Sequence, residues 1–433
     1  MVRRGLWLAS LGLLWLAAFG AIVGLVGWLL WPRPTPMHVK AMPPLPRAWP
    51  KTLQLGMSSG PDEAIQMRST AAFGFRYQYL AGGVNTGNGW AGWNPDGSFV
   101  TDYIRDSNEH GMVPVFTYYM LTQSAPGRGD GPSEPEAVQA NVSNVDTMRA
   151  YFLDLRLFFQ KAGSLGGKPV VLHVEPDLWG FLHQRAKTEN ATQIPIVVGA
   201  TGLPELTDLP NDVRGFAQAI VRLRDRSAPN VVLGYHVSAW GSGTDLFVSN
   251  ALDSVVDDVA RREAAFYASL DAAFDVAFAE LSDRDAAFKQ HIYRDKGRSW
   301  WDADDFTRHI RFLSRFVELT GQRIVLWQIP LGNTRMRAMD NTWNHFQDTR
   351  VEWLLDDPDR EHLDQYVKAG VIGLLFGRGA DGATNATDSA GDGLTDPAPI
   401  NGNDRPSINS DDDGGYFRER AAAYYREGAI ALP

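Results

Sequence analysis

The richest concentration of chemically useful side chains lies in the segment His173-Val-Glu175-Pro-Asp177-Leu-Trp179. Hydrophobic residues precede it, as in a buried strand, and two acidic groups follow where that strand ends. Because alternate strand residues share a face, His173 and Glu175 are expected on one side. Pro176 ends strand pairing and places Asp177 on the loop beyond.

Two carboxyl groups beside a tryptophan in a cleft of low dielectric constant can acquire separated pKa values. We therefore predict Asp177 as a general acid and Glu175 as its partner, tuning its pKa. The alternative is structural: Glu175 pairs with an internal arginine such as Arg76, and Asp177 caps the next helix.

A second carboxyl group is needed for acid–base chemistry, and Asp283 is the first candidate. It belongs to the run Glu280-Leu-Ser-Asp283-Arg-Asp285, which follows a β-rich segment, and could be a base, a nucleophile or a helix cap. Asp381 is the next candidate. Near the end of the β-rich run 323–330 stands Gln328, whose amide cannot serve as a nucleophile.

Tryptophans and polar residues near the ends of β-rich segments suggest a binding surface for sugar rings or other flat ligands. The predicted ligand-binding residues are Trp90, Trp93, Tyr118, His173, Trp179, His236, Trp240, Trp327 and Gln328.

No cofactor is predicted. The chain has no cysteine, and GMSSGPDE after the first β-rich run lacks both a dinucleotide motif and a Walker lysine. Two metal alternatives stay open: a zinc site at His173, His236 and Glu175, without any compact motif, and a Ca²⁺ site in the Asp-rich loop 378–413.

Eight β-rich runs alternate with helical patterns, which predicts a parallel sheet with crossover helices. We expect a (β/α)8 TIM-like barrel over residues 51–433, with a distorted seven-stranded barrel as the variant, because the sixth run is the weakest. The runs are 52–59, 75–81, 112–120, 169–175, 230–240, 274–281, 323–330 and 371–377.

The segment VVLHVEPDLWGFL resembles the strand-end motif of glycoside hydrolase family 6, the cellulases and cellobiohydrolases. PNVVLGYHVSAWGSG (229–243) resembles the next block of that family. The resemblance implies a distorted α/β barrel with Asp177 as the proton donor. The carboxylate of the family's third strand is absent from TYYMLTQSAPG, and the family's late Gly-Glu-Cys-Asp-Gly segment is missing, so cellulase activity itself is not implied.

Residues 6–31 carry no charge and follow Arg3 and Arg4, a pattern typical of an N-terminal transmembrane signal-anchor. Residues 32–50 are proline-rich and are expected to form a stalk. These features predict a membrane-anchored protein in contact with the bilayer, whose barrel is extracytoplasmic, at a bacterial cell surface or in the periplasm. The net charge of −10 at pH 7 disfavours nucleic acid as a partner.

Together these observations predict a glycoside hydrolase that cleaves an oligosaccharide or polysaccharide by carboxylate catalysis. The alternatives are a non-catalytic carbohydrate-binding envelope protein on a similar barrel, and a metal-dependent hydrolase. The sugar, its linkage and the oligomeric state are not specified by the sequence.

Overall fold

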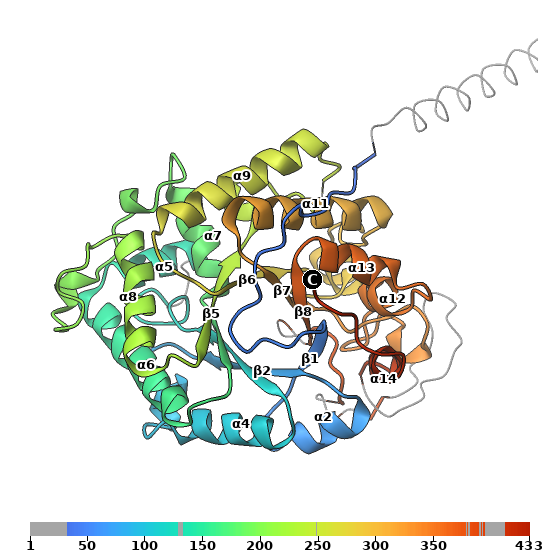
Figure 1. Cartoon of the computed structure of the whole chain (residues 1–433), viewed down its shortest axis with the longest axis horizontal. Helices are drawn as coiled ribbons and strands as arrows, with labels where there is room; N and C mark the ends of the chain where they lie inside the picture. The colour runs from blue at the N-terminus through green and yellow to red at the C-terminus, as the bar shows by residue number, and fades with distance from the viewer. Residues whose placement is uncertain are drawn as a thin grey trace, which may run out of the picture.

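The computed structural model describes residues 33–128, 133–247, 249–377, 379, 382–388, 391, 393–394 and 412–433. Within them, eight parallel strands close into a barrel in sequence order, so the predicted TIM-like barrel is confirmed and the seven-stranded variant is wrong (Figure 1). The strands are β1 (Gln54–Ser58), β2 (Phe75–Ala81), β3 (Val113–Tyr119), β4 (Val170–Val174), β5 (Val231–Val237), β6 (Val276–Glu280), β7 (Ile324–Ile329) and β8 (Val371–Phe376).

Helices surround this barrel on its outside (Figure 1). Those before β5 are α2 (Ala64–Thr70), α3 (Trp90–Trp93), α4 (Ser98–Glu109), α5 (Glu134–Val142), α6 (Val145–Ser164), α7 (Pro176–Arg185) and α8 (Val213–Ser227). Those after it are α9 (Asp253–Ser269), α10 (Ala286–Phe288), α11 (Ala303–Thr320), α12 (Arg350–Leu355), α13 (Glu361–Lys368) and α14 (Tyr416–Arg426). Short helical turns include η3 (Ala239–Ser242) and η4 (Lys289–Tyr293).

The inside of the barrel is filled by side chains from alternate strand positions. Val115 on β3 pairs with Val171 on β4, which pairs with Val232 on β5, so these branched residues form one layer of the inner core. Below them, Trp49 packs into the same cluster and its indole Nε1 donates to the Ile372 carbonyl at 3.2 Å. One end of the barrel is thereby filled by side chains.

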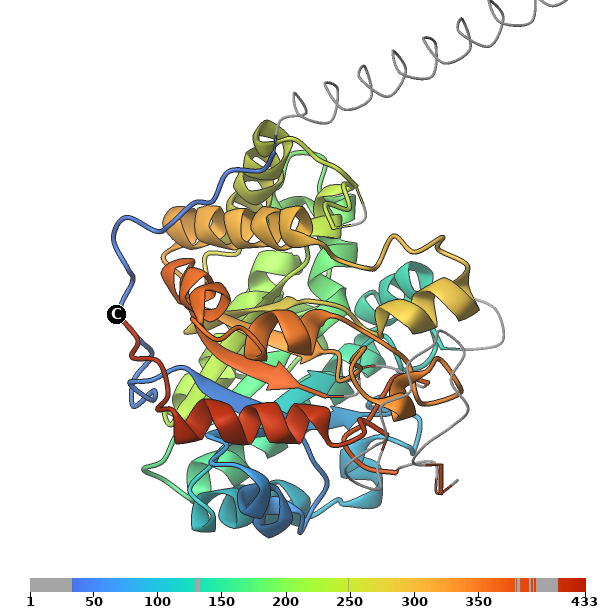
Figure 2. The same cartoon turned by 90° about the vertical axis from the view of Figure 1, so that its right-hand side faces the viewer.

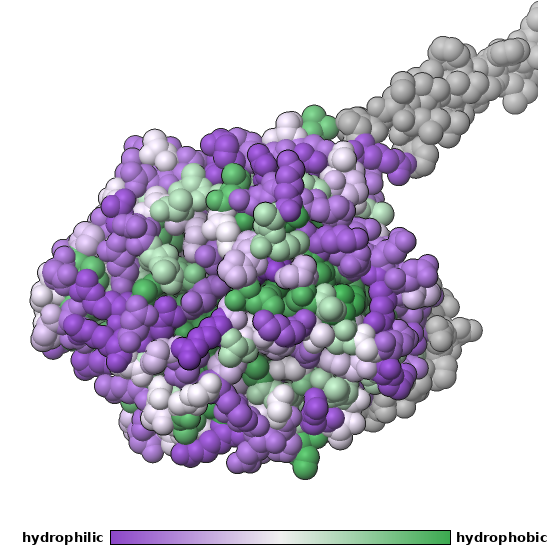
Figure 3. Space-filling view, in the orientation of Figure 1, coloured by the Kyte–Doolittle hydropathy of each residue, from purple (hydrophilic) through white to green (hydrophobic). Residues whose placement is uncertain are grey.

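Residues 33–50, the predicted stalk, lie along the barrel as an extended segment (Figure 2). The Ser314 hydroxyl on α11 donates to the Met37 carbonyl at 2.8 Å, and the Val39 amide donates to the Lys368 carbonyl at 3.1 Å. Figure 3 shows that the face beneath this segment is mostly hydrophilic, with apolar side chains gathered near its centre.

The membrane localisation expected from the sequence is corrected here. No helix in the described part of the chain is both long enough and apolar enough to cross a membrane. Residues 6–31, on which the predicted anchor rested, lie outside the described residues.

Candidate active site

A cavity of about 820 Å³ opens at the carboxyl ends of the strands, where TIM-barrel active sites are built. Five acidic side chains line it, from four different connections: Glu134, Asp177, Asp245, Glu280 and Asp283. Aromatic rings complete the wall, among them Tyr79, Tyr119, Trp240, Trp301 and Trp327. Acids beside aromatic faces in one cleft are the combination that the sequence predicts.

Asp177 lies in the first turn of α7, directly after β4, and its carboxyl group lines the cavity. Burial raises the pKa of Asp177 to about 6; the negative charges of Glu134 and Asp283 add to the rise, and a hydrogen bond with Tyr119 opposes it. A carboxyl group with a pKa near 6 retains its proton in part of the molecules near neutrality. Asp177 therefore lines the cavity as expected, and its role as proton donor stays a prediction.

Glu175 is fully buried and does not line the cavity. Its backbone adopts a left-handed conformation (φ 46°), which turns the carboxylate towards β3, where it accepts from the amides of Met120 and Leu121 at 3.1 Å. Burial raises its pKa to about 8, and the charge of Asp177 contributes to this rise. Glu175 thus interacts with Asp177 electrostatically while bracing the end of β3.

Asp283 lies on the loop after β6 and also lines the cavity. It forms ion pairs with Lys289, at 2.7 Å, and with Arg284. Although burial acts in the opposite direction, these cations hold the pKa of Asp283 below its usual value. The pKa values of Asp177 and Asp283 are therefore shifted in opposite directions within one cavity.

Glu280 is a further cavity acid, and it was not predicted as a site residue from the sequence. Glu280 ends β6, two positions after Phe278, so both side chains lie on the same face of the strand. The Phe278 ring packs on His173 inside the barrel, with 4.1 Å between ring centres, so Glu280 points inward as well. Burial and the charges of Asp283 and Asp177 raise its pKa to about 8. No hydrogen bond or ion pair satisfies its carboxyl group among the interactions of the described residues.

Gln328 occupies the end of β7, in a left-handed conformation (φ 50°) where the register with β8 is irregular. Such a bulge re-aims a side chain, and here the Gln328 amide donates to the Tyr79 hydroxyl at 2.5 Å inside the cavity. A left-handed backbone at a residue other than glycine carries strain, so the structure around the tips of β4 and β7 must hold both residues in place.

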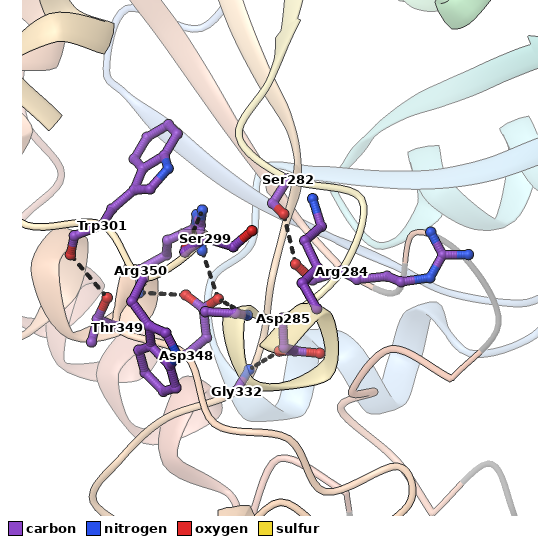
Figure 4. A network of polar contacts seen from close by, with 12 residues as sticks. Ser282, Arg284, Asp285, Ser299, Trp301, Gly332, Asp348, Thr349 and Arg350 are labelled. Carbon is purple, nitrogen blue, oxygen red and sulfur yellow. Dashed lines mark hydrogen bonds and ion pairs between the residues drawn. The ribbon is translucent and has the colours of Figure 1, made fainter. Parts of the chain in front are cut away.

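A buried polar network holds the loop that carries Asp283 (Figure 4). Asp285 accepts from the Gly332 amide at 2.9 Å and from the Thr384 amide at 2.8 Å. Asp348 accepts from the Ala286 amide at 2.8 Å and from the Arg350 guanidinium at 2.6 Å. Residue 332 must be glycine, because an added Cβ would lie 2.0 Å from the Phe346 carbonyl oxygen.

Arg350 extends this network to the cavity wall, which it lines together with Trp301. Its guanidinium carbon lies 4.6 Å from the centre of the Trp301 ring, within the range of a cation–π contact. Arg350 was not expected from the sequence. It comes from a segment far along the chain from β4, so no local pattern marked it.

The predicted ligand-binding aromatics separate into two groups. Trp240 and Trp327 line the cavity, and Trp240 reaches it by packing over Gly180, where an added Cβ would lie 2.4 Å from its ring. The indole Nε1 of Trp90 and the hydroxyl of Tyr118 instead donate to the buried Asp154. Trp179 is buried against Phe216, Tyr235 and Phe274, and Trp93 is exposed against Phe99 outside the cavity lining.

His173 and His236 lie inside the barrel, beneath Trp327. The Nε2 atom of His173 lies 2.9 Å from Nδ1 of His236, so these nitrogens hydrogen-bond to each other, while the Glu175 carboxylate faces Met120 and Leu121. Within the described ranges, no group of three or more His, Asp or Glu side chains is arranged to hold a metal ion. Asp381, like most of the loop 378–413, lies outside those ranges.

No protein-family model and no curated protein matches this chain. Among solved structures it is similar to a family 26 endo-β-1,4-mannanase from Cellulomonas fimi (11% identity, TM-score 0.49, 88% of this chain and 72% of that one). It is also similar to the family 26 endo-β-1,4-mannanase catalytic domain of Bacillus sp. JAMB-750 (10%, 0.46, 88% and 88%). A third is a family 5 xyloglucan-specific β-1,4-glucanase from a ruminal metagenomic library (10%, 0.44, 87% and 88%).

The resemblance to glycoside hydrolase family 6 is contradicted. No family model matches, and the strands close in sequence order into an eight-stranded barrel rather than the distorted barrel that the resemblance implies. The EPD segment belongs to a β4–α7 turn whose glutamate is structural and whose aspartate reaches the cavity.

Proposed function

We propose that this protein hydrolyses glycosidic bonds in an oligosaccharide or polysaccharide, with Asp177 as the general acid. The observation that carries the proposal is the contrast within one cavity between Asp177, whose pKa is raised to about 6, and Asp283, whose pKa is lowered by Lys289 and Arg284. Pairs of carboxyl groups with separated pKa values are the machinery of glycoside hydrolysis.

In this mechanism Asp177 donates its proton to the glycosidic oxygen as the bond to the anomeric carbon breaks. Asp283, ionised beside its two cations, acts on the other side of that carbon as base for a water molecule or as nucleophile. Tyr119 lines the cavity with Asp177, and its hydroxyl opposes the rise in the pKa of that acid. Trp240 and Trp301 offer ring faces on which a pyranose can stack.

A second candidate function is non-catalytic carbohydrate binding. The observation that favours it is Gln328: the tip of β7, re-aimed into the cavity, presents an amide rather than a carboxylate. Such a protein would keep the aromatic walls and bind sugars without turnover.

A polysaccharide screen distinguishes the two functions. The full chain is incubated with neutral, acidic and amino-sugar polysaccharides, and new reducing ends are measured. If the protein is a hydrolase, the wild type releases reducing ends. The rate of release should be at least about a hundredfold lower in Asp177→Asn, because a general acid usually contributes that much. The matched control is Asp102→Asn, at an exposed position on α4, which should retain full activity. Binding without any release in the wild type would favour the second function.

A further inference from the structure

The proposed function leaves the chemical class of the sugar open, and one corner of the cavity bears on it. Phe247, Trp301, His309 and Phe312 all line the cavity, and we call these four residues the aromatic corner. The centre of the Phe247 ring lies 5.4 Å from that of Trp301, 5.0 Å from that of His309 and 6.0 Å from that of Phe312. The corner therefore presents an apolar surface to the cavity, with one imidazole among its rings.

His309 lies on α11 and is almost completely enclosed, with 1% of the residue exposed. Its Nδ1 atom lies 3.0 Å from the hydroxyl oxygen of Tyr366 on α13. Its Nε2 atom is buried and has no hydrogen-bond partner among the described residues. Since buried polar atoms normally have a partner, Nε2 is available to a group that enters this corner from the cavity.

The hydrogen bond to Tyr366 determines which nitrogen of His309 carries the ring proton. Burial lowers the pKa of His309 to about 3, and the charge of Arg350 adds to this effect, so the imidazole is neutral and carries one proton. Tyr366 is fully buried, and its hydroxyl has no other partner in the described part of the chain. The hydroxyl hydrogen is therefore satisfied by donation to Nδ1. Nε2 then carries the ring proton and is a donor, and it points away from Tyr366 because the two ring nitrogens diverge.

A donor set among aromatic rings selects the kind of group that can bind there. Phe247, Trp301 and Phe312 have no side-chain acceptor, so the hydrogen of a sugar hydroxyl would find no partner among them. A carboxylate would gain little, because Arg350, which lies over the Trp301 ring, is already paired with Asp348 at 2.6 Å. An acetyl group matches both features of the corner, since its carbonyl oxygen only accepts and its methyl group is apolar.

Resting on the proposed function, we propose that the substrate is an acetylated oligosaccharide or polysaccharide, and that the aromatic corner binds one of its N-acetyl or O-acetyl groups. The carbonyl oxygen of that group accepts from Nε2 of His309, and its methyl group packs against Phe247 and Phe312. His309 is then a specificity-determining residue, and Tyr366 is a positioning residue that fixes its tautomer.

The test is calorimetric binding of two pairs of neutral hexamers to the full chain. The first pair is β-1,4-linked N-acetylglucosamine and glucose, and the second is O-acetylated and deacetylated β-1,4-linked mannose. We expect the acetylated member of one pair to bind at least about tenfold more tightly than its counterpart. The pair that shows this preference distinguishes an N-acetyl from an O-acetyl group. No preference in either pair would overturn the inference.

The variant His309→Phe keeps an aromatic ring in the corner and removes its donor, so the preference for the acetylated hexamer should be lost. Tyr366→Phe removes the hydroxyl that fixes the tautomer and should weaken the preference. The matched control His38→Phe, at an exposed position in the segment 33–50, should keep it. A preference that survives His309→Phe in full would overturn the inference.

Nitrogen-15 spectra of the wild-type imidazoles test the inference without any variant, and so apply even if His309→Phe fails to fold. His309 should carry its proton on Nε2. The Nε2 resonance should shift when the preferred acetylated hexamer is added, and should stay in place with its unacetylated counterpart. A ring proton on Nδ1, or an Nε2 resonance that does not respond to the acetylated hexamer, would overturn the inference.

These outcomes are separate from those of the proposed function. Preferential binding of an acetylated hexamer, with no cleavage of it or of any polysaccharide in the screen, would support the acetyl site and contradict hydrolysis. Cleavage of unacetylated polysaccharides, without any preference for acetylated ones, would support hydrolysis and contradict the acetyl site.

Discussion

The carboxylate of Asp283 lies 2.7 Å from the ammonium nitrogen of Lys289, and among the described residues no other carboxyl group that lines the cavity forms an ion pair. This ion pair, with that to Arg284, lowers the pKa of Asp283, while burial raises the pKa values of Asp177 and Glu280. The cavity thereby holds one carboxylate that stays ionised next to carboxyl groups that retain protons near neutrality.

Lys289→Met should move the acid limb of the pH–activity profile to higher pH. Removing the cation raises the pKa of Asp283, so a higher pH is needed to ionise it. The measurement is kcat/KM against pH for the wild type, Lys289→Met and the control Lys187→Met, at an exposed position. An acid limb that does not move in Lys289→Met would remove Asp283 from the reaction.

Asp285→Asn should flatten the dependence of stability on pH. The pKa of Asp285 is raised to about 7 by burial and by the neighbouring Asp348. An acid whose pKa is raised on folding gives stability that is complete below its unfolded pKa, about 4, and is lost as pH rises through its folded pKa. Its contribution to the free energy of unfolding should therefore fall between about pH 4 and 7.

The measurement is denaturant unfolding at several pH values in that window. Asn cannot ionise, so the difference in slope between wild type and variant reports the titration of Asp285 together with its interaction with Asp348. Equal slopes would show that Asp285 is ionised throughout, and that the network in Figure 4 is held by charge.

Trp240→Ala should raise KM for an oligosaccharide about tenfold or more, since loss of a stacking face costs about 1.4 kcal/mol or more of binding. The control is Trp93→Ala: Trp93 is 58% exposed, packs on Phe99 and lies outside the cavity lining. The sequence alone predicts both tryptophans as ligand-binding, but only Trp240 lines the cavity. Equal effects of the two substitutions on KM would show that the ligand does not bind in this cavity alone.

Glu175→Gln should keep kcat within about tenfold of the wild type. Glutamine retains an oxygen that accepts from the Met120 and Leu121 amides, and it mimics the protonated acid, since the pKa of Glu175 is about 8. Glu175→Ala leaves both buried amides without a partner and should lower the free energy of unfolding by about 2 kcal/mol or more. A Glu175→Gln enzyme that folds normally and has lost its basic pH limb would instead make Glu175 the proton donor.

Features that depend on local sequence could be predicted, whereas features that depend on contacts between distant parts of the chain could not. Each β-strand has its own pattern of buried residues, so all eight runs and their closure into a barrel were predictable. Even β6, the weakest run, lies within the predicted 274–281. Asp177 was predictable as a cavity residue because it follows a buried strand and a proline.

The rest depends on tertiary contacts. The left-handed backbone at Glu175 turns its carboxylate away from the cavity, and nothing in its neighbours signals that conformation. Trp90 looks like a loop residue in the sequence, yet its indole donates to Asp154 on α6, across 64 positions of chain. Arg350 reaches the cavity wall only because Asp348 and Trp301 hold it there.

The central claim is that Asp177 protonates the leaving group, and leaving-group dependence tests it most directly. Asp177→Asn is compared with wild type on a polysaccharide fragment and on an aryl glycoside of the same sugar whose phenol leaves without protonation. We predict a loss of at least about a hundredfold on the first and less than tenfold on the second. Equal losses on both substrates, or none on either, would contradict the role of Asp177 as general acid.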